Sequence, residues 1–396
     1  MIQISGRHNT ALCHIEYLEM EAQDQIRELC DQEAFTDTKI RIMPDAHAGA
    51  GCVIGFTSNI NDAVVPNLIG VDIGCGMYAI DLGADDIDLE TLDSIIKRNV
   101  PSGFDVHKND TCDVTQLGLL CIGSVKNIHR QNKSMGTLGG GNHFIELDES
   151  EDNSKWLVIH SGSRNLGLQV AQIYQELAWN TLTSNTTDSE ALIAKYKEEG
   201  REKEISSALA ELKKRHYVGI PKDLAYLTGE LKDQYLHDMR ICQQFAKDNR
   251  EAMSQRILVG LRTSGQHEFF HTVHNYIGDD DIVRKGAISA HEGERVLIPF
   301  NMRDGSIIGV GKGNPDWNYS APHGAGRIMS RSRARKELQL DTFKQQMTGV
   351  FSTTICQETI DEAPDAYKPA QQILDALEPT VTITQRLLPL YNFKAK

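Results

Sequence analysis

The chain has 396 residues, of which 40% are hydrophobic and 24% charged, and its formal net charge at pH 7 is −14. This composition is typical of a globular protein with a core, and it disfavours a protein that coats nucleic acid nonspecifically, because such proteins are basic. No apolar run reaches the roughly 18 residues of a membrane span, and the first residues do not resemble a signal peptide, so we expect a cytoplasmic protein. The eight scattered cysteines do not predict a disulfide framework.

The first 160 residues predict a mixture of helices and strands. Apolar residues at helical spacing, β-branched runs and glycine turn signals indicate the following order: a helix at 16–32, a short strand at 39–43, strands and tight loops over 49–83, a helix at 87–98, and strands at 142–147 and 156–160.

The rest of the chain turns helical and then returns to strands. Residues 165–261 carry a helical pattern, and the charged stretch 190–215 is expected to be exposed. Strands follow over 283–310, and a helix is expected to begin near His323. Because the polar motifs described next lie on both sides of the helical section, we predict an α+β fold. A single mixed domain would span residues 1–396, with a central β core, peripheral helices and a helical insertion.

Five short segments carry most of the potential chemistry. They are VDIGCGM at 71–77, GGGNHF at 139–144, IHSGSR at 159–164, HN at 274–275 and PHGAGR at 322–327. Together they supply a thiol, a carboxylate and four imidazoles, a mixture that suits a borderline-soft transition metal better than magnesium or calcium. Their glycines allow the backbone to approach phosphate closely, so the combination indicates nucleotide chemistry.

Each candidate residue also has a structural interpretation. Cys75 could bridge two metals beside the hard donor Asp72, or it could be a buried thiol next to a turn-forming carboxylate. His160 could be a satisfied core residue, although the neighbouring Arg164 is suited to hold phosphate. His323 stands among small residues that leave room for an adduct, which favours a nucleophile over an enclosed ligand.

One competing motif indicates a different enzyme. The sequence HEFFH at 267–271 matches HExxH, and Glu292 or Glu294 could be a third zinc ligand if the segment were helical. A metalloprotease would, however, leave Cys75 and the other histidines unexplained. His274 lies on the same helical face as His267 and His271, and spacing alone leaves open which of the three binds metal.

The motifs together resemble the RtcB-type RNA ligases, which are GTP-dependent tRNA-splicing and RNA-repair enzymes. The resemblance extends through most of the chain in one order: PDAH at 44–47, the Asp72 and Cys75 motif, NHFIE at 142–146, His160 through Gly167, His274-Asn275, RKGA at 284–287, His323 through Arg327, EAPDAYK at 362–368 and Lys394.

The resemblance implies a specific activity. It predicts a manganese- and GTP-dependent ligase that joins RNA 2′,3′-cyclic phosphate or 3′-phosphate ends to 5′-hydroxyl ends, with His323 as the residue that takes GMP. Two Mn²⁺ ions sharing Cys75 would be bound by Asp72, Cys75, His143, His160 and His274. The implied GTP or GMP contacts are Asn142, His143, Phe144, Ile145, Glu146, His274, Asn275, Pro299, Phe300, Asn301, Met302, Ser306, His323, Gly324, Ala325, Gly326 and Lys394. Arg164 and Arg327 are candidates for binding RNA or phosphate.

The chain also departs from the family pattern. It has PFNMRDG at 299–305 where many members have PGSMG, it has Asn165 at a usual glycine, and it is short for the family. We therefore expect a divergent branch, with the hypothesis that it repairs particular broken RNAs rather than splicing tRNA. The alternative prediction is a metal-dependent cyclic phosphodiesterase or phosphatase that acts on RNA ends without ligating them.

Overall fold

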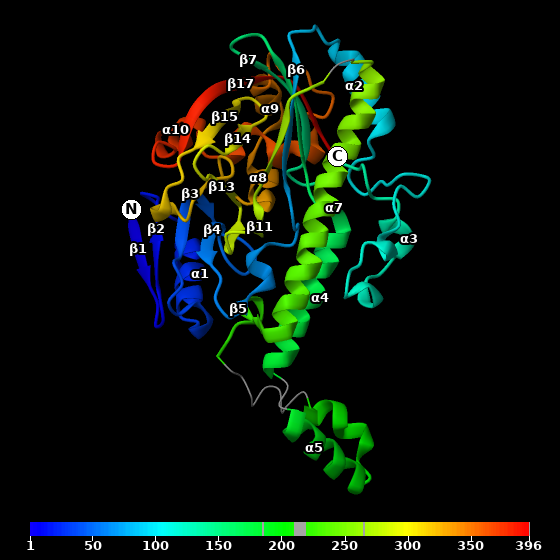
Figure 1. Cartoon of the computed structure of the whole chain (residues 1–396), viewed down its shortest axis with the longest axis vertical. Coiled ribbons are helices and arrows are strands. Elements are labelled where there is room, and N and C mark those ends of the chain that lie inside the picture. Colours follow the sequence, from blue (N-terminus) through cyan, green and yellow to red (C-terminus); the bar gives the residue numbers. More distant parts are fainter. Residues whose placement is uncertain (184–185, 210–218, 264–265, 396) are drawn as a thin grey trace.

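The computed structural model describes residues 1–183, 186–209, 219–263 and 266–395 (Figure 1). Two larger sheets organise it, and their strand pairs are antiparallel except for β2 with β3. The six-stranded sheet has the order β1 (Ile2–Ser5), β2 (Thr10–Cys13), β3 (Arg41–His47), β4 (Ile54–Asn59), β12 (Ile282–Lys285) and β11 (Asn275–Ile277). The seven-stranded sheet has the order β10 (Phe269–Val273), β6 (Gly76–Gly83), β8 (Lys155–Ser161), β7 (Phe144–Ser150), β17 (Val381–Lys394), β15 (Gly305–Gly311) and β14 (Arg295–Asn301).

Two short pairs and a set of helices complete the fold. The pairs are β13 (Ala287–Ser289) with β16 (Ser320–Pro322), and β5 (Ala63–Val64) with β9 (Leu227–Thr228). The helices are α1 (Met20–Cys30), α2 (Leu89–Asn99), α3 (Ile128–Gln131), α4 (Arg164–Thr183), α5 (Thr186–Glu198), α7 (Gly229–Leu261), α8 (Arg331–Glu337), α9 (Leu340–Gln346) and α10 (Ala370–Ala376). The predicted mixture of sheets and helices is confirmed.

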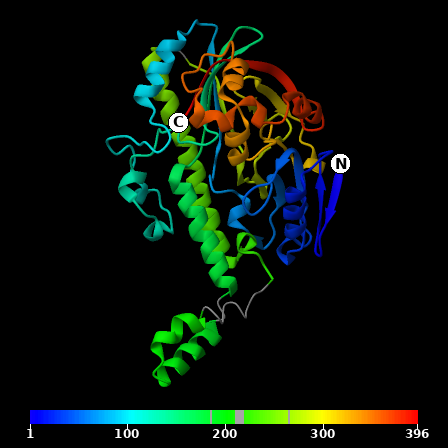
Figure 2. The same ribbon diagram turned by 180° about the vertical axis from the view of Figure 1, so that it is seen from behind.

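Helices cover one face of the seven-stranded sheet and leave the other to the functional residues. Leu157 and Ile159 of β8 pack with α2 and α7, whereas Trp156 and Val158, which alternate with them, belong to a second apolar cluster on the opposite face. His160 continues that alternation, so strand geometry places its ring on the face away from the two helices. Figure 2 shows the long helices α4 and α7 beside the sheet, seen from behind.

Most of the predicted elements are present, with shifted ends. The strands expected at 142–147 and 156–160 are β7 and β8, the helix at 87–98 is α2, and the helix at 16–32 is the shorter α1. The strand expected at 39–43 continues through Pro44 as β3. The helical section contains α4, α5 and α7, while residues 210–215 of the predicted charged helix lie outside the described residues.

One expectation about local structure is wrong, and the helix that the competing HExxH interpretation would require is not formed. The helix expected near His323 begins at Arg331, because residues 323–330 are irregular and Gly326 has a positive φ of 71°, which ends regular structure there. The HExxH segment is also not a helix, since residues from Phe269 onward form β10 and pair with β6.

The two histidines of HExxH, one before β10 and one within it, contact different partners. His267 Nδ1 lies 3.0 Å from the carbonyl oxygen of Asp81, and His271 Nε2 lies 3.2 Å from Glu251 Oε1. Glu268, the base of a zincin, has a largely exposed side chain 3.3 Å from Arg295. A helical zinc site at this motif is therefore excluded. Within the described parts of the chain, no helix is long and apolar enough to cross a membrane.

Candidate active site

A cavity of about 450 Å³ lies where the ends of the two larger sheets meet. Strand ends supply most of its walls, and all five motifs contribute residues that line it directly. The lining residues are His47, Ile54, Val71, Asp72, Cys75, Met77, Asn142, Phe144, Glu146, His160, His274, Asn275, Gly286, Pro299, Phe300, Asn301, Met302, His323, Gly324, Ala325, Gly326, Arg327, Arg331, Glu362, Tyr367, Asn392 and Lys394.

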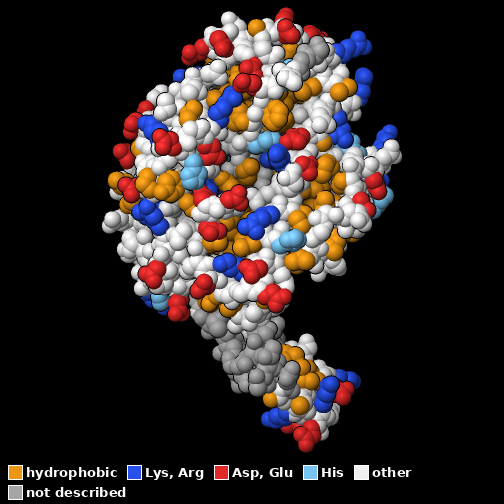
Figure 3. Space-filling model, in the orientation of Figure 1, with side chains coloured by type: hydrophobic (Ala, Val, Ile, Leu, Met, Phe, Trp, Pro, Cys, Tyr) orange, Lys and Arg blue, Asp and Glu red, His pale blue; other side chains and the backbone are white. Residues whose placement is uncertain are grey.

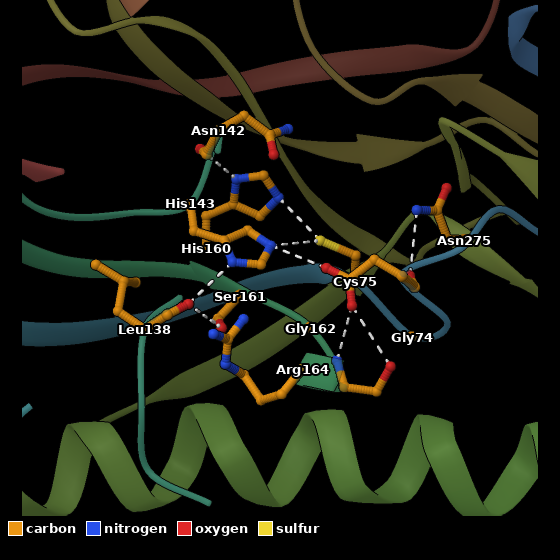
Figure 4. Close-up of polar contacts among 12 residues, drawn as sticks. Gly74, Cys75, Leu138, Asn142, His143, His160, Ser161, Gly162, Arg164 and Asn275 are labelled. Carbon is orange, nitrogen blue, oxygen red and sulfur yellow. Dashed lines mark hydrogen bonds and ion pairs between the residues drawn. The ribbon is translucent and has the colours of Figure 1, made fainter. Parts of the chain in front are cut away.

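Cys75 lies at the centre of two groups of possible metal ligands. One group is Cys75, His160 and His274, and the other is Asp72, Cys75 and His143, and in each group the ligand atoms lie within 4.8 Å of one another. Cys75 Sγ is 3.2 Å from His160 Nε2 and 3.4 Å from His143 Nε2 (Figure 4). A thiolate common to both groups is an arrangement that can bridge two transition-metal ions.

Backbone carbonyls orient two of these imidazoles. His143 Nδ1 lies 2.9 Å from the carbonyl oxygen of Leu138, and His160 Nδ1 lies 3.1 Å from that of Asn142. When Nδ1 of a neutral imidazole donates to a carbonyl, the lone pair is left on Nε2, and in His160 that atom faces Cys75. In His143 the Nε2 atom faces both Cys75 and Asp72. His274 Nδ1 is buried and has no hydrogen-bond partner among the described residues, so this nitrogen is available to coordinate a metal.

Asp72 contacts His143, which directly precedes β7, and Ser163, which directly precedes α4. Its Oδ2 lies 2.9 Å from His143 Nε2, and its Oδ1 accepts a 3.0 Å hydrogen bond from the backbone N–H of Ser163. Burial alone would raise the pKa of Asp72, but hydrogen bonding with His143 and the charge of Arg164 lower it overall. The carboxylate therefore stays ionised and available to a cation.

Burial favours the uncharged forms of three of these candidate ligands, His160, His274 and Cys75. It lowers the pKa of His160 and of His274 well below the usual value, helped by neighbouring imidazoles, and it raises the pKa of Cys75 well above the usual value together with the charge of Asp72. Two neutral imidazoles, a thiol and a carboxylate form a donor set that fits divalent transition metals, because a metal can displace the thiol proton.

His323 stands next to this ligand cluster. Its ring centroid is 4.9 Å from that of His274, and its Nδ1 lies 2.6 Å from Oδ2 of the fully buried Asp45. The same oxygen accepts from the backbone N–H of His323 at 3.2 Å. Lys368 Nζ donates to the carbonyls of Pro44 and Ala46, which fixes the strand that carries Asp45. The Asp45 contact leaves His323 Nε2 as the free nitrogen of a residue that lines the cavity.

Three cations surround one buried carboxylate at another wall. Glu362 accepts from Lys394 Nζ at 2.7 Å, and it lies 2.7 Å from Arg331 and 3.2 Å from Arg327. Burial would raise its pKa, but these three cations lower it to about 2. Glu362 thus remains charged and fixes the position of three positive side chains that can receive phosphate.

A second buried carboxyl group faces a different part of the cavity. Glu146 accepts a 2.6 Å hydrogen bond from Asn392, and burial raises its pKa to about 7 against the opposing effects of Asn392 and Lys394. Asp148, two residues further along the same face of β7, is buried without a partner for either oxygen among the described residues, and burial together with Glu146 raises its pKa. A carboxyl group poised near neutrality can accept hydrogen bonds from a nucleobase when ionised.

Some predicted site residues do not line the cavity. Ile145 points to the helix-covered face of the sheet and packs in the core there, as the alternation along β7 requires. Ser306 is fully buried in β15, and its hydroxyl has no partner among the described residues. His143 lies one layer behind the wall, against Asp72 and Cys75. Arg164 donates from Nε to Thr137 Oγ1 at 3.1 Å and packs against Gly139.

The unusual segment 299–305 contains the end of β14, the turn at 302–304 and the first residue of β15. Pro299, Phe300, Asn301 and Met302 line the cavity, and Phe300 is buried. Arg303 instead lies outside the wall, where its guanidinium contacts Asp304 at 2.7 Å. Arg303 therefore adds no charge to the cavity lining, whereas the bulky Phe300 contributes to the apolar part of the wall.

Two buried residues of α7 connect the segments that carry the ligands. Arg250 donates from Nη1 to the carbonyls of Gly74 and Ser161, both at 2.8 Å, and these residues adjoin Cys75 and His160. Asn249 Oδ1 accepts from the backbone N–H groups of Gly136 and Thr137, and its Nδ2 donates to the carbonyl of Gly162. Figure 4 shows the helix directly below these segments.

Several site residues were not assigned roles from the sequence. Asp45 and Glu362 belong to motifs that carry the family resemblance, so their motifs were identified in the sequence but no role was predicted for either residue. Asn249 and Arg250 are single polar positions in a helical pattern, where nothing distinguishes them from exposed residues. Arg331 is one of several basic residues in a charged stretch, and its place in the cavity wall depends on the tertiary structure.

Comparison with known proteins identifies the family. The sequence matches the family described as tRNA-splicing ligase RtcB over residues 25–122 and 120–395. The chain is 30% identical over 389 residues to the RNA-splicing ligase RtcB of Escherichia coli strain K12, an alignment covering 88% of each chain. It is 24% identical to the tRNA-splicing ligase RtcB of Aeropyrum pernix, with 84% of this chain and 82% of that protein covered. The chain belongs to the RtcB family, and the predicted resemblance is confirmed.

Proposed function

We propose that this protein, an RNA ligase of the RtcB family, joins RNA 3′-phosphate or 2′,3′-cyclic phosphate ends to 5′-hydroxyl ends, with GTP as co-substrate and Mn²⁺ as its metal. The observation that carries the proposal is the position of His323 beside two groups of possible metal ligands that share Cys75. A metal site that only hydrolyses phosphate esters would not require His323, an imidazole that is oriented by Asp45 and faces the same cavity without belonging to either ligand group.

His323 is proposed as the nucleophile. With Nδ1 hydrogen-bonded to Asp45, the Nε2 lone pair attacks the α-phosphorus of GTP, the nitrogen–phosphorus bond forms, and pyrophosphate leaves with the electron pair of the broken phosphoanhydride bond. Asp45 stabilises the imidazolium that develops on His323. Asp72, Cys75, His143, His160 and His274 would hold two divalent ions, which when bound neutralise phosphate charge.

Two further transfers complete the proposed reaction. An oxygen of the RNA 3′-phosphate attacks the phosphorus of the His323 adduct, so that the guanylyl group moves to the RNA and the imidazole is released. The 5′-hydroxyl oxygen of the second strand then attacks the 3′-phosphate phosphorus, loses its proton and displaces GMP. A cyclic phosphate end must first be opened by water. Positioning and charge stabilisation supply most of the acceleration in such transfers.

The walls of the cavity suit the two substrates. Lys394, Arg327 and Arg331, held by Glu362, provide a cationic wall for phosphates. Glu146 with Asn392 provides acceptors for the N–H groups of guanine, next to the apolar side chains of Phe144 and Phe300. Asn142, Asn275 and the segment from Gly324 to Gly326 complete the proposed guanylate contacts.

The proposal is tested by assaying ligation and hydrolysis with the same RNAs. Wild-type protein with GTP and Mn²⁺ should convert a 3′-phosphate strand and a 5′-hydroxyl strand into one product, and His323→Ala should abolish that product. Glu268→Gln should leave the rate unchanged, because Glu268 lies outside the cavity. Opening of cyclic ends that never leads to a joined strand would support the phosphodiesterase alternative and contradict the proposal.

A further inference from the structure

Phe104 is a large aromatic side chain exposed at the tip of a turn. The backbone N–H of Asp105 donates to the carbonyl of Ser102 at 3.0 Å, and Gly103 has a positive φ of 62°, so residues 102–105 form a tight turn. Phe104 is 93% exposed, more than any other large hydrophobic side chain in the described residues. Turn tips favour small or polar residues, so an exposed phenylalanine here needs an explanation other than folding.

The turn is attached to the glycine-rich segment that leads into the cavity. The backbone N–H of Gly103 donates to the carbonyl of Gly139 at 2.8 Å, and Ser102 and Gly139 form an isolated parallel bridge. Asn142, three residues beyond Gly139, lines the cavity. Further along the loop, His107 binds the carbonyl of Gly136. Phe104 is thus presented from a turn that is hydrogen-bonded to the segment leading into the cavity.

Guanidinium groups lie beside the same turn and glycine-rich segment. Arg130 of α3 donates to the carbonyl of Phe104, and Arg164 packs against Gly139. The two charges interact, since Arg130 adds to the effect of burial that lowers the pKa of Arg164. Arg331 of the cavity wall lies beside Gly141. The net charge of the chain is −14, and charges of both signs are interspersed on the face in Figure 3. These three arginines, by contrast, contact the turn of Phe104 or the glycines at 139–141, and positive side chains of this kind can bind phosphates.

We propose that Phe104 stacks on a nucleobase of single-stranded RNA close to the end that is being joined, while Arg130 and Arg164 bind the adjacent phosphates. An exposed aromatic ring beside arginines is the arrangement by which proteins hold single strands without reading their sequence, because every base offers a flat face. This inference rests on the proposed function, since it takes the RNA end to be in the cavity. It adds a contact outside the guanylate and metal sites.

The first test separates RNA binding from the chemistry on GTP. Phe104→Ala should raise the dissociation constant for a short single-stranded RNA with a 3′-phosphate by roughly 5- to 100-fold, the range expected for loss of one base–aromatic stack. Phe104→Trp should bind at least as well as wild type. Tyr17→Ala, which removes an aromatic ring that is 81% exposed and does not line the cavity, is the matched control and should change nothing.

Formation of the protein–GMP adduct without RNA should be unaffected by Phe104→Ala. An equal loss of adduct formation would mean that Phe104 has a structural role, and unchanged RNA affinity would mean that the ring serves another partner, such as a protein. Either result overturns the inference. Binding is measured by fluorescence anisotropy without GTP, so the inference remains testable even if the wild-type protein forms no adduct and the proposed function fails.

A second test locates the stacked base. Abasic nucleotides are placed singly at the last three positions of the 3′-phosphate strand and the first three of the 5′-hydroxyl strand. One position should weaken binding to wild type by the same factor as Phe104→Ala and have no further effect on the variant. Independent, additive losses at every position would contradict a stack between that base and Phe104.

Discussion

Asp45 is the residue whose contact decides which nitrogen of His323 faces the cavity. It is fully buried, and its 2.6 Å contact with Nδ1 fixes both the tautomer and the orientation of the ring. Its other oxygen, Oδ1, is buried without a partner among the described residues, so the carboxylate is committed to His323. The pairing resembles other sites in which a buried carboxylate orients a reactive imidazole.

Replacing this carboxylate by an amide should slow the first chemical step. Asp45→Asn keeps the size of the side chain but cannot stabilise a charged imidazolium, so we expect adduct formation from GTP to fall about 100-fold, as for loss of other partners that orient an imidazole. Rapid-quench measurement of labelled GMP transfer to the protein gives the rate. Manganese content should match wild type, because Asp45 belongs to neither ligand group. A variant with the wild-type rate would show that Asp45 does not orient a nucleophile.

Glu146 should make GTP use depend on pH near neutrality. Its pKa is raised to about 7, so the carboxyl group is protonated below that value and ionised above it. Only the ionised form accepts hydrogen bonds with both oxygens, so the KM for GTP should fall as the pH rises from 6 to 8 at saturating Mn²⁺. Glu146→Gln should remove this change and raise the KM at pH 8 by about 10- to 100-fold. The same pH dependence in Glu146→Gln would assign it to another group.

At the scale of elements, α7 connects the parts of the site that the chain separates. Asn249 and Arg250 hydrogen-bond to three segments that lie about a hundred or more residues earlier in the sequence. Arg250 is fully buried, and burial lowers its pKa to about 10 although Cys75 and Asp72 oppose the change. The guanidinium thus also places a positive charge behind the ligands, which favours their anionic forms.

Removing that guanidinium should weaken the metal site. Arg250→Met leaves the carbonyls of Gly74 and Ser161 without this donor and removes the buried charge, so we expect Mn²⁺ affinity to fall about 10- to 100-fold. Arg240→Met changes an exposed arginine of the same helix and is the matched control. Isothermal titration with Mn²⁺ measures the affinity, and circular dichroism checks that α7 remains folded. Unchanged affinity in a folded Arg250→Met protein would assign Arg250 to stability alone.

Periodicity predicted the elements that deliver the ligands, but not the contacts between them. Alternating apolar residues identified β7 and β8, which position Phe144 and His160. The helix expected near His323 starts later than predicted, because glycines follow His323. The helix α8 begins after Ser330, whose side chain caps it by accepting from the backbone N–H of Arg333. The partnership of Asp45 with His323 joins positions 278 residues apart, and no local pattern encodes such a contact.

At the scale of the whole molecule, two sheets meet so that motifs from the beginning, middle and end of the chain surround one cavity. Cys75 directly precedes β6, His274 lies between β10 and β11, and Lys394 is the last residue of β17. The backbone N–H of His274 donates to the carbonyl of Cys75, so the junction of the two sheets also brings these candidate ligands together. The five motifs were recognisable in the sequence because each is short and local, and the fold supplies their proximity.

The central claim is that His323 accepts GMP beside a pair of ions bridged by Cys75. It is tested most directly by incubating the purified protein with GTP and Mn²⁺ without RNA and locating the adduct by peptide mass spectrometry under non-acidic conditions. The account predicts one guanylyl group on His323, absent from His323→Ala and from Cys75→Ala. A guanylyl group on a different residue, or an adduct that persists in Cys75→Ala, would contradict it.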